Sequence, residues 1–174
     1  MTLIIRDATP ADAGACAAIY RPYVLDTAIT FETDPPADAE MARRITAATA
    51  TYAWLVAVLS GDIVGYAYAG PFAVRPAYRW FCEVSVYLEP GRRRTGAGRA
   101  LYDALLTRLV DRGYRVAVAK MTLPNDASIG LHTALNFQPV GIHRRIGWKH
   151  GAWHDVAIAQ RELIAGDATP AEPA

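Results

Sequence analysis

A basic, glycine-rich turn at residues 92–98, with the sequence RRRTGAG, carries the clearest chemical signal in the chain. It follows a strand-like segment at 81–88 and precedes a segment at 99–110 whose apolar residues recur at helical spacing. Unpaired N–H groups and the positive end of a helix dipole meet at such a turn. Gly96 and Gly98 let a phosphate approach the backbone. The turn is therefore expected to cradle a pyrophosphate.

Other phosphate-binding patterns fit this turn poorly. A dinucleotide-binding loop has a third glycine where Leu101 stands, and a triphosphate loop ends in G-K-[ST], which the chain lacks. A second interpretation stays open from the turn alone, namely a tight strand-to-helix connection with solvated arginines.

The elements that must position the turn are expected in the order β-α-α-β-β-β-α-β-α-β-β. The order predicts a mixed α/β fold around one sheet. Strands are expected at 3–6, 53–59, 63–68, 81–88, 116–121, 139–145 and 153–161, helices at 13–20, 37–49, 96–112 and 126–135, and irregular chain at 21–36 and 70–79. Residues 1–165 are expected to form one domain, and the Ala/Pro-rich residues 166–174 a flexible tail.

Length and composition limit the classes of function. A chain of 174 residues, 52% of them hydrophobic, suffices for one domain with a packed core. A net charge of +1 argues against a general nucleic-acid binder. The first residues are too short and polar for a signal peptide, and no apolar run approaches the roughly 20 residues that cross a bilayer. A soluble, cytoplasmic protein without a membrane partner is expected.

The cysteines and histidines do not suggest a metal site. Cys16 and Cys82 lie far apart in apolar surroundings, which favours two buried free thiols. His143, His150 and His154 lack a strong metal-ligand spacing.

A second pattern, N-x-x-S-x-x-x-H-x-x-L-N-F at 125–137, completes a family resemblance. Together with the [QR]-x-x-G-x-[GA] match at 93–98, it resembles the acyl-CoA-binding core of the GCN5-related N-acetyltransferases. The resemblance covers residues 4–163. It implies a GNAT fold, classed α/β (α+β), with one mixed, mostly antiparallel sheet, a splayed strand pair and flanking helices.

Segments outside the turn narrow the resemblance. Residues 20–23, 30–32, 70–78, 83–87, 123–126, 132–135 and 149–155 resemble the phosphinothricin and methionine-sulfone acetyltransferases. Two positions depart from the wider superfamily. His132 stands where most members have the tyrosine that protonates the leaving thiolate, although the narrower group shares the histidine. Asn136 replaces a glycine, a mild change because Asn tolerates left-handed backbone.

The resemblance implies acetyl-CoA as acetyl donor, without a metal. Backbone groups of the strand at 84–88 would bind the pantetheine arm, with the Val86 N–H as thioester polariser. Asn125 would bind the pantetheine amide. The expected cofactor-binding residues are Val84, Val86, Tyr87, Leu88, Arg93, Arg94, Thr95, Gly96, Ala97, Gly98, Arg99 and Asn125.

Two side chains are expected to be catalytic. Glu83 stands where the family carries its carboxylate and would act as general base through a water, unless it is a strand-end carboxylate paired with Arg75 or Arg79. His132 is a second base or a donor to the thiolate, unless it only bonds a backbone carbonyl. Tyr102 is expected to pack in the core rather than bind cofactor.

The acceptor implied is a small amino-acid analogue such as L-phosphinothricin, methionine sulfone or methionine sulfoximine. Arg75 and Tyr78 would clamp its oxygens, and Phe31 would pack on its stem. A homodimer is expected from the likeness alone. Two alternatives stay open: acetylation of another small amine or a protein N-terminus, and a non-catalytic acyl-CoA-binding module.

Overall fold

The central feature of the computed structural model, which describes residues 2–92, 95–166 and 169–174, is a seven-stranded sheet in the order β1-β2-β3-β4-β5-β7-β6. The strands are β1 (Leu3–Asp7), β2 (Trp54–Leu59), β3 (Asp62–Pro71), β4 (Phe81–Leu88), β5 (Val116–Thr122), β6 (Gln138–Lys149) and β7 (Ala152–Glu162). Only β4 and β5 pair in parallel among these strands; the other neighbours are antiparallel. The expected mixed, mostly antiparallel sheet is confirmed.

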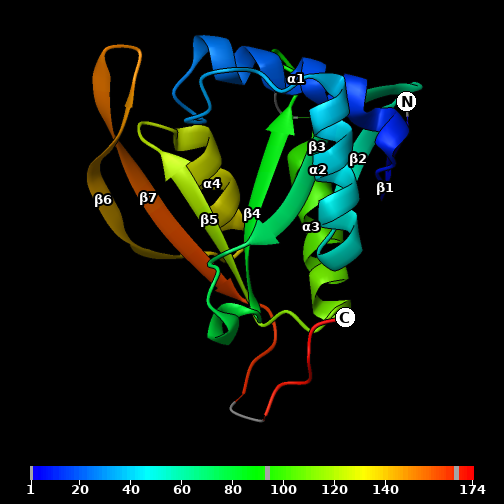
Figure 1. The fold of residues 1–174 in the computed structure, drawn as a ribbon, viewed down its shortest axis with the longest axis vertical. Coiled ribbons are helices and arrows are strands. Elements are labelled where there is room, and N and C mark those ends of the chain that lie inside the picture. The colour runs from blue at the N-terminus through cyan, green and yellow to red at the C-terminus, as the bar shows by residue number, and fades with distance from the viewer. Residues whose placement is uncertain (1, 93–94, 167–168) are drawn as a thin grey trace.

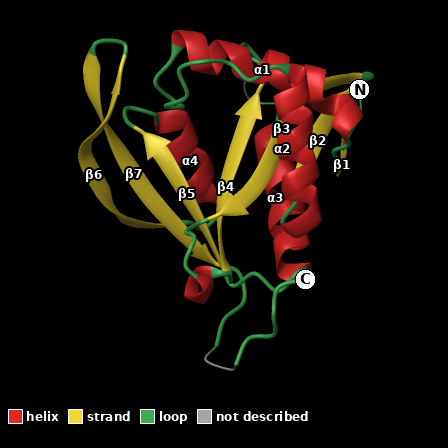
Figure 2. Ribbon diagram, in the orientation of Figure 1, coloured by secondary structure: helices red, strands yellow, loops and turns green. Residues whose placement is uncertain are grey.

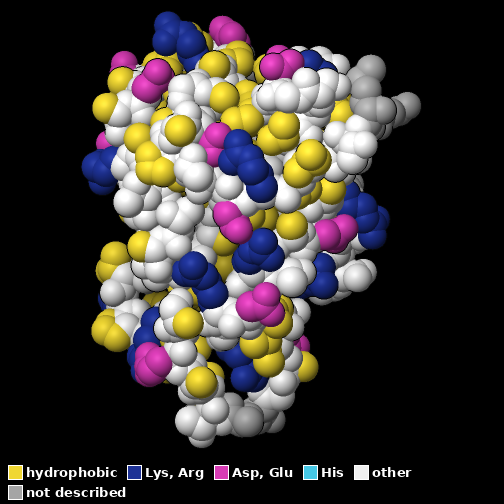
Figure 3. Space-filling model, turned by 90° about the vertical axis from the view of Figure 1, so that its right-hand side faces the viewer, with side chains coloured by type: hydrophobic (Ala, Val, Ile, Leu, Met, Phe, Trp, Pro, Cys, Tyr) yellow, Lys and Arg dark blue, Asp and Glu magenta, His cyan; other side chains and the backbone are white. Residues whose placement is uncertain are grey.

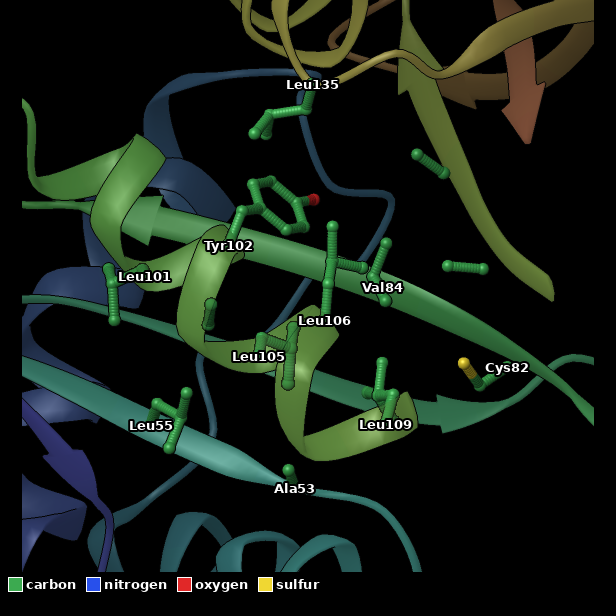
Figure 4. Close-up of a cluster of buried hydrophobic side chains, with 14 of the residues drawn as sticks. Ala53, Leu55, Cys82, Val84, Leu101, Tyr102, Leu105, Leu106, Leu109 and Leu135 are labelled. Carbon is green, nitrogen blue, oxygen red and sulfur yellow. The ribbon is translucent and has the colours of Figure 1, made fainter. Parts of the chain in front are cut away.

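The helices cover both faces of the sheet (Figure 2). They are α1 (Ala13–Asp26), α2 (Asp38–Thr51), α3 (Ala97–Asp111) and α4 (Asp126–Ala134), with short 3-10 turns η1 (Pro10–Asp12) and η2 (Pro76–Tyr78). Side chains on a strand alternate between faces, so each face has its own core. Leu101, Leu105 and Leu109 of α3 pack in one cluster with Leu55 and Val84 (Figure 4).

The second cluster joins α1 and α2 to the opposite face of the sheet. Trp54, Val56 and Tyr66 belong to it, together with Ile19 of α1 and Met41 of α2. Strands β2, β3 and β4 are thus buried between two layers of helix, whereas β6 is exposed along nearly its whole length. On one side of the molecule, basic and acidic side chains are interspersed on the surface (Figure 3), in line with the net charge of +1.

Helix α1 corrects one expectation. The chain was expected to become irregular at Arg21, because Pro22 lacks an N–H and disfavours a helix interior. The helix instead continues through Pro22 to Asp26. Val24 is buried, and the Tyr23 hydroxyl donates to the Leu88 carbonyl oxygen at 2.7 Å. Tertiary packing of the last helical turn therefore outweighs the local cost of the proline.

Other element boundaries shift by a few residues. The strand expected at 139–145 continues to Lys149 and forms a hairpin with β7 at His150–Gly151, both with positive φ. Asn136 has the expected left-handed backbone, with φ of 60°. Cys16 and Cys82 are buried free thiols, as expected.

Residues at the C-terminal end contact the base of the sheet. The Trp80 indole N–H donates to the Ala171 carbonyl oxygen at 2.8 Å, and Arg79 pairs with Glu172 at 2.7 Å. Both contacts reach the loop immediately before β4. Among the residues described, no helix combines the length and apolar character needed to cross a membrane.

Candidate active site

A gap opens between β4 and β5 where their pairing stops. Phe81, Cys82 and Glu83 are in register with residues 116–118, and beyond Glu83 the two strands diverge (Figure 1). The last part of β4 therefore keeps β3 as a neighbour but loses β5. Backbone groups on its open side are available to an extended ligand, because a strand edge presents unpaired N–H and C=O groups.

The register fixes which residues face this gap. The Glu89 N–H donates to the Val64 carbonyl oxygen across the β3 edge, at 2.9 Å. Successive backbone groups of a strand point to opposite sides, so Val84, Val86 and Leu88 face away from β3, toward the gap. The Leu88 carbonyl is already engaged by Tyr23. Val84 directly follows Glu83, the last residue in register with β5, so Val86 is the gap-facing residue that lies wholly beyond this pairing.

The backbone of Tyr87 faces β3 rather than the gap. Its ring is buried on the α1 side of the sheet, with centroids 4.8 Å from Tyr20 and 5.1 Å from Tyr23 in edge-to-face arrangements. The backbone of Tyr87 is therefore turned away from the gap, and its contact with cofactor stays a prediction.

The turn before α3 leaves open space at the helix N-terminus. Gly96 is the N-cap with φ of 78°, and a Cβ there would meet no atom within 4 Å. Gly98 differs, since a Cβ there would lie 3.5 Å from Leu88 and from Leu131. Gly96 thus leaves room for an anion, whereas a Cβ at Gly98 would make ordinary van der Waals contacts with β4 and α4.

Several other residues of the turn have contacts within the protein. The Ala97 N–H is 3.4 Å from Thr95 Oγ1, and Arg99 is exposed and 3.6 Å from Asp103. Arg92 pairs with Glu89. Arg93 and Arg94, both expected to bind cofactor, lie outside the described residues.

Asn125 is the N-cap of α4. Its Oδ1 accepts the Ser128 N–H at 3.1 Å, an ordinary capping bond. The Asn125 side chain therefore has a structural partner, and its amide N–H₂ group is the part that a ligand would have to use.

His132 is 4% exposed, and both of its ring nitrogens have partners. Nδ1 lies 2.7 Å from the Ser128 carbonyl oxygen, which can only accept, so Nδ1 carries the proton. Nε2 is then the acceptor for the Tyr102 hydroxyl, 2.9 Å away. Burial lowers the pKa of His132, and burial raises the pKa of Tyr102. A neutral imidazole held between a carbonyl and a phenol results.

Glu83 forms an ion pair with a residue that the sequence did not suggest. Its Oε2 lies 2.6 Å from Lys120 Nζ, and the two side chains are 31% and 43% exposed. The alternative pairing with Arg79 is wrong, because Arg79 pairs with Glu172. The carboxylate sits at the last register pair before β4 and β5 diverge, beside the gap.

The expected acceptor clamps lie on the segment between β3 and β4. Lys120 Nζ is 5.9 Å from the Phe72 ring, and the Phe72 ring packs edge-to-face against Tyr78 at 5.6 Å. Aromatic contacts thus connect Tyr78 to the Glu83–Lys120 pair. Arg75 is the N-cap of η2, and its side chain is exposed.

Phe31 lies on the segment between α1 and α2. A Cβ at Gly147 would overlap its ring, and its centroid is 6.2 Å from that of His154. Neighbouring Thr30 anchors the segment. Its hydroxyl is 2.6 Å from that of Tyr20, and its carbonyl accepts from Lys149 Nζ at 2.8 Å. Phe31 is therefore held against the β6–β7 hairpin.

Comparison with known proteins identifies the family. The family model described as "Acetyltransferase (GNAT) domain" matches residues 5–158. The chain belongs to the GNAT acetyltransferase family. Its β4–β5 gap, its open helix N-terminus at Gly96 and its capped α4 are thus features of a GNAT domain.

Three similar proteins place this GNAT domain more narrowly. A phosphinothricin N-acetyltransferase of Streptomyces viridochromogenes is 40% identical over 159 residues, 91% of this chain and 87% of that protein. An L-methionine sulfoximine/L-methionine sulfone acetyltransferase of Pseudomonas aeruginosa is 37% identical, over 94% and 96% of the two chains. The structure of a phosphinothricin acetyltransferase from Sinorhizobium meliloti in complex with AcCoA has a TM-score of 0.93 and 42% identity, covering 99% and 95%.

The roles of two side chains in this GNAT site, Lys120 and Tyr102, were not predicted from the sequence. Lys120 was predicted only as part of a strand, although a lysine inside the run VAVAKMT is a visible anomaly. Tyr102 was predicted to pack in the core, and it does, but its hydroxyl also reaches His132. A contact between residues 30 positions apart leaves no local sequence signal.

The described residues include no cluster of three or more His, Cys, Asp or Glu side chains that could hold a metal ion.

Proposed function

We propose that the protein transfers an acetyl group from acetyl-CoA to the amino group of a small amino-acid analogue. Phosphinothricin, methionine sulfone and methionine sulfoximine are the leading acceptors, after the names of the relatives. The observation that carries the proposal is the position of Glu83 at the point where β4 and β5 part.

The residues present fit acetyl-CoA, which supplies an acetyl group activated as a thioester when bound. Gly96 leaves open space where the N–H groups at the start of α3 favour a pyrophosphate. Arg93, Arg94, Thr95, Ala97, Gly98 and Arg99 complete the proposed cradle. Val84 and Val86 direct backbone groups into the gap, and the Val86 N–H is the proposed donor to an oxygen that gains negative charge.

Glu83 and His132 divide the proton chemistry in this proposal. Glu83 accepts a proton from the acceptor ammonium through a water, since general bases act within hydrogen-bond reach or through one water. Lys120 holds the Glu83 carboxylate in place. His132, neutral and bonded to Tyr102, belongs to the pathway that returns a proton to the leaving thiolate. Arg75, Tyr78 and Phe31 contact the acceptor.

A homodimer and a cytoplasmic location are further parts of the proposal. The dimer is supported by the β6–β7 hairpin, where the paired rings of Trp148 and Trp153 are 59% and 51% exposed. Exposed apolar patches of this kind are typical of interfaces. Size-exclusion chromatography with light scattering tests the dimer, and cell fractionation tests the location.

Thiol release from acetyl-CoA by the purified protein tests the activity. We expect turnover with kcat/KM of about 10⁴ M⁻¹s⁻¹ or more on L-phosphinothricin, L-methionine sulfone or L-methionine sulfoximine. Activity on phosphinothricin would also predict resistance of host cells to that herbicide. Turnover confined to spermidine or peptide N-termini would show that the acceptor is a polyamine or a protein N-terminus rather than a small amino-acid analogue. Tight acetyl-CoA binding with no turnover on any amine would favour a non-catalytic module.

A further inference from the structure

A cavity lies between α2 and strands β2 and β3. The cavity has a volume of about 280 Å³, close to the lower limit of about 300 Å³ for small-molecule sites. Its sheet side is aromatic, with Trp54 stacked on Tyr68 at 4.4 Å and on Tyr66 at 5.2 Å between centroids. Met41 and Ala48 line its helix side. None of the residues that the sequence predicts to be catalytic, cofactor-binding or acceptor-binding lines this cavity.

One end of the cavity lies beside Glu83. Gly70 lines the cavity and is directly opposite Glu83 in the β3–β4 register. Directly opposed residues of an antiparallel pair project from the same face of the sheet. A Cβ at Gly70 would meet no atom within 4 Å, so the space above it is open. An acceptor whose amine lies at Glu83 can therefore extend across Gly70 into the cavity.

The charges at the cavity are already balanced. Arg43 and Arg44 both line it. Arg44 pairs with Glu32 at 2.7 Å and with Glu40 at 2.9 Å, and Arg43 pairs with Glu40 at 2.8 Å. Two guanidinium groups thus face two carboxylates. An anionic side chain entering the cavity would lose hydration without gaining an unpaired cation, which is unfavourable.

We infer that this cavity is the subsite for the acceptor's side chain and that it selects neutral, apolar or thioether-derived side chains over anionic ones. The inference rests on the proposed function, because it places the acceptor amine at Glu83. It ranks the neutral side chains of methionine sulfone and of norleucine above the anionic phosphinate of phosphinothricin. Recognition of the acceptor's side chain by Arg75 and Tyr78 would give the opposite ranking.

The substitution Ala47→Trp tests the subsite. Ala47 lines the cavity but is exposed on α2, so a large side chain there fills the cavity without entering the core. Ala39→Trp is the matched control, since Ala39 is exposed on the same helix and does not line the cavity. Thermal unfolding of each variant verifies that it is folded.

The expected result is a change in KM that depends on the acceptor. Ala47→Trp should raise KM for L-methionine sulfone and L-norleucine about tenfold or more, because hydrophobic pockets discriminate on this scale. L-Alanine, which does not reach the cavity, should keep its kcat/KM within about twofold. Ala39→Trp should change neither. An unchanged KM for the two long acceptors in folded Ala47→Trp overturns the subsite, and a wild-type preference for phosphinothricin overturns the charge selection.

A binding readout separates this inference from the proposed activity. If the wild-type enzyme turns over none of these acceptors, the proposed function fails while the cavity stays testable. Trp54 lines the cavity, and the NMR signal of its buried indole N–H reports on the surroundings of the ring. L-Norleucine should shift that signal in the wild-type protein and in Ala39→Trp but not in Ala47→Trp. No shift in the wild-type protein, or equal shifts in all three, refutes the subsite.

Discussion

The hydroxyl of Tyr102 on α3 lies 2.9 Å from Nε2 of His132 on α4, and both side chains are buried. A phenol on α3 thus lies directly against an imidazole on α4, 30 positions along the chain. The pair therefore combines a neutral imidazole with a hydroxyl that burial keeps protonated.

Tyr102→Phe tests whether this hydroxyl takes part in proton transfer. We expect kcat to fall about tenfold to a hundredfold with little change in KM, because positioned proton donors contribute on this scale. The matched control is Tyr114→Phe, which also removes a hydrogen bond of a buried tyrosine, to the Thr51 carbonyl, at a distant site. Both variants should lose about 1 kcal/mol of stability. Equal activity losses in the two variants would assign Tyr102 to packing alone.

The titration of His132 follows from its burial. Burial lowers the pKa of His132 below its usual value of about 6.5, so folding favours the neutral ring. The unfolded chain then binds more protons than the folded one below about pH 6.5, and stability contributed by this residue declines as the pH falls. NMR titration of the His132 ring should show Nδ1 protonated and Nε2 unprotonated at pH 6.5. A ring that is mostly imidazolium at that pH contradicts the assignment.

Glu83 and Lys120 should respond differently to substitution. Glu83→Gln removes the proposed base and should lower kcat about a hundredfold or more. Lys120→Met removes only its half-exposed partner, and exposed ion pairs contribute about 0.2–1 kcal/mol, so kcat should fall less than about tenfold. Steady-state kinetics of the two variants at one pH gives the comparison. A loss in Lys120→Met as large as in Glu83→Gln would give Lys120 a direct part in the reaction.

Acid stability should depend on Asp12. Two bonds from Arg6, each 2.8 Å long, and a bond from the Thr9 N–H lower the pKa of Asp12 to about 2. A carboxylate with a depressed pKa stabilises the fold above its unfolded pKa of about 3.9, and that contribution is lost as the pH falls toward about 2. Urea unfolding of the wild-type protein should show this loss between these values. Asp12→Asn should be less stable at pH 6 and should show a shallower acid slope.

The sequence predicted the order of the elements and the position of the glycine-containing turn before α3, because local signals carry both. Glycine at 96, alternation along 81–88 and the helical period after 99 all act within a few residues. The continuation of α1 through Pro22 was missed, since it depends on Val24 packing and on the Tyr23–Leu88 bond across 65 positions.

In the site, too, the contacts that the sequence did not predict join residues far apart along the chain. Glu83 was predicted as a site residue from the family resemblance, whereas its ion-pair partner Lys120 lies 37 positions along the chain, on a strand that only the parallel pairing brings alongside. The anchoring of the Phe31 segment by Lys149 spans 119 positions. Pairings of this length follow from the topology of the sheet, which a single sequence specifies only indirectly.

The two cysteines have a practical consequence for measuring motion in the site. Cys16 and Cys82 are both 0% exposed, and burial raises the pKa of each thiol to about 12. Thiol reagents attack through the thiolate, so both native cysteines should react slowly at pH 7–8. A single cysteine introduced at an exposed position, such as Thr33 beside the Phe31 segment, could then be labelled with a fluorophore without first removing the native thiols.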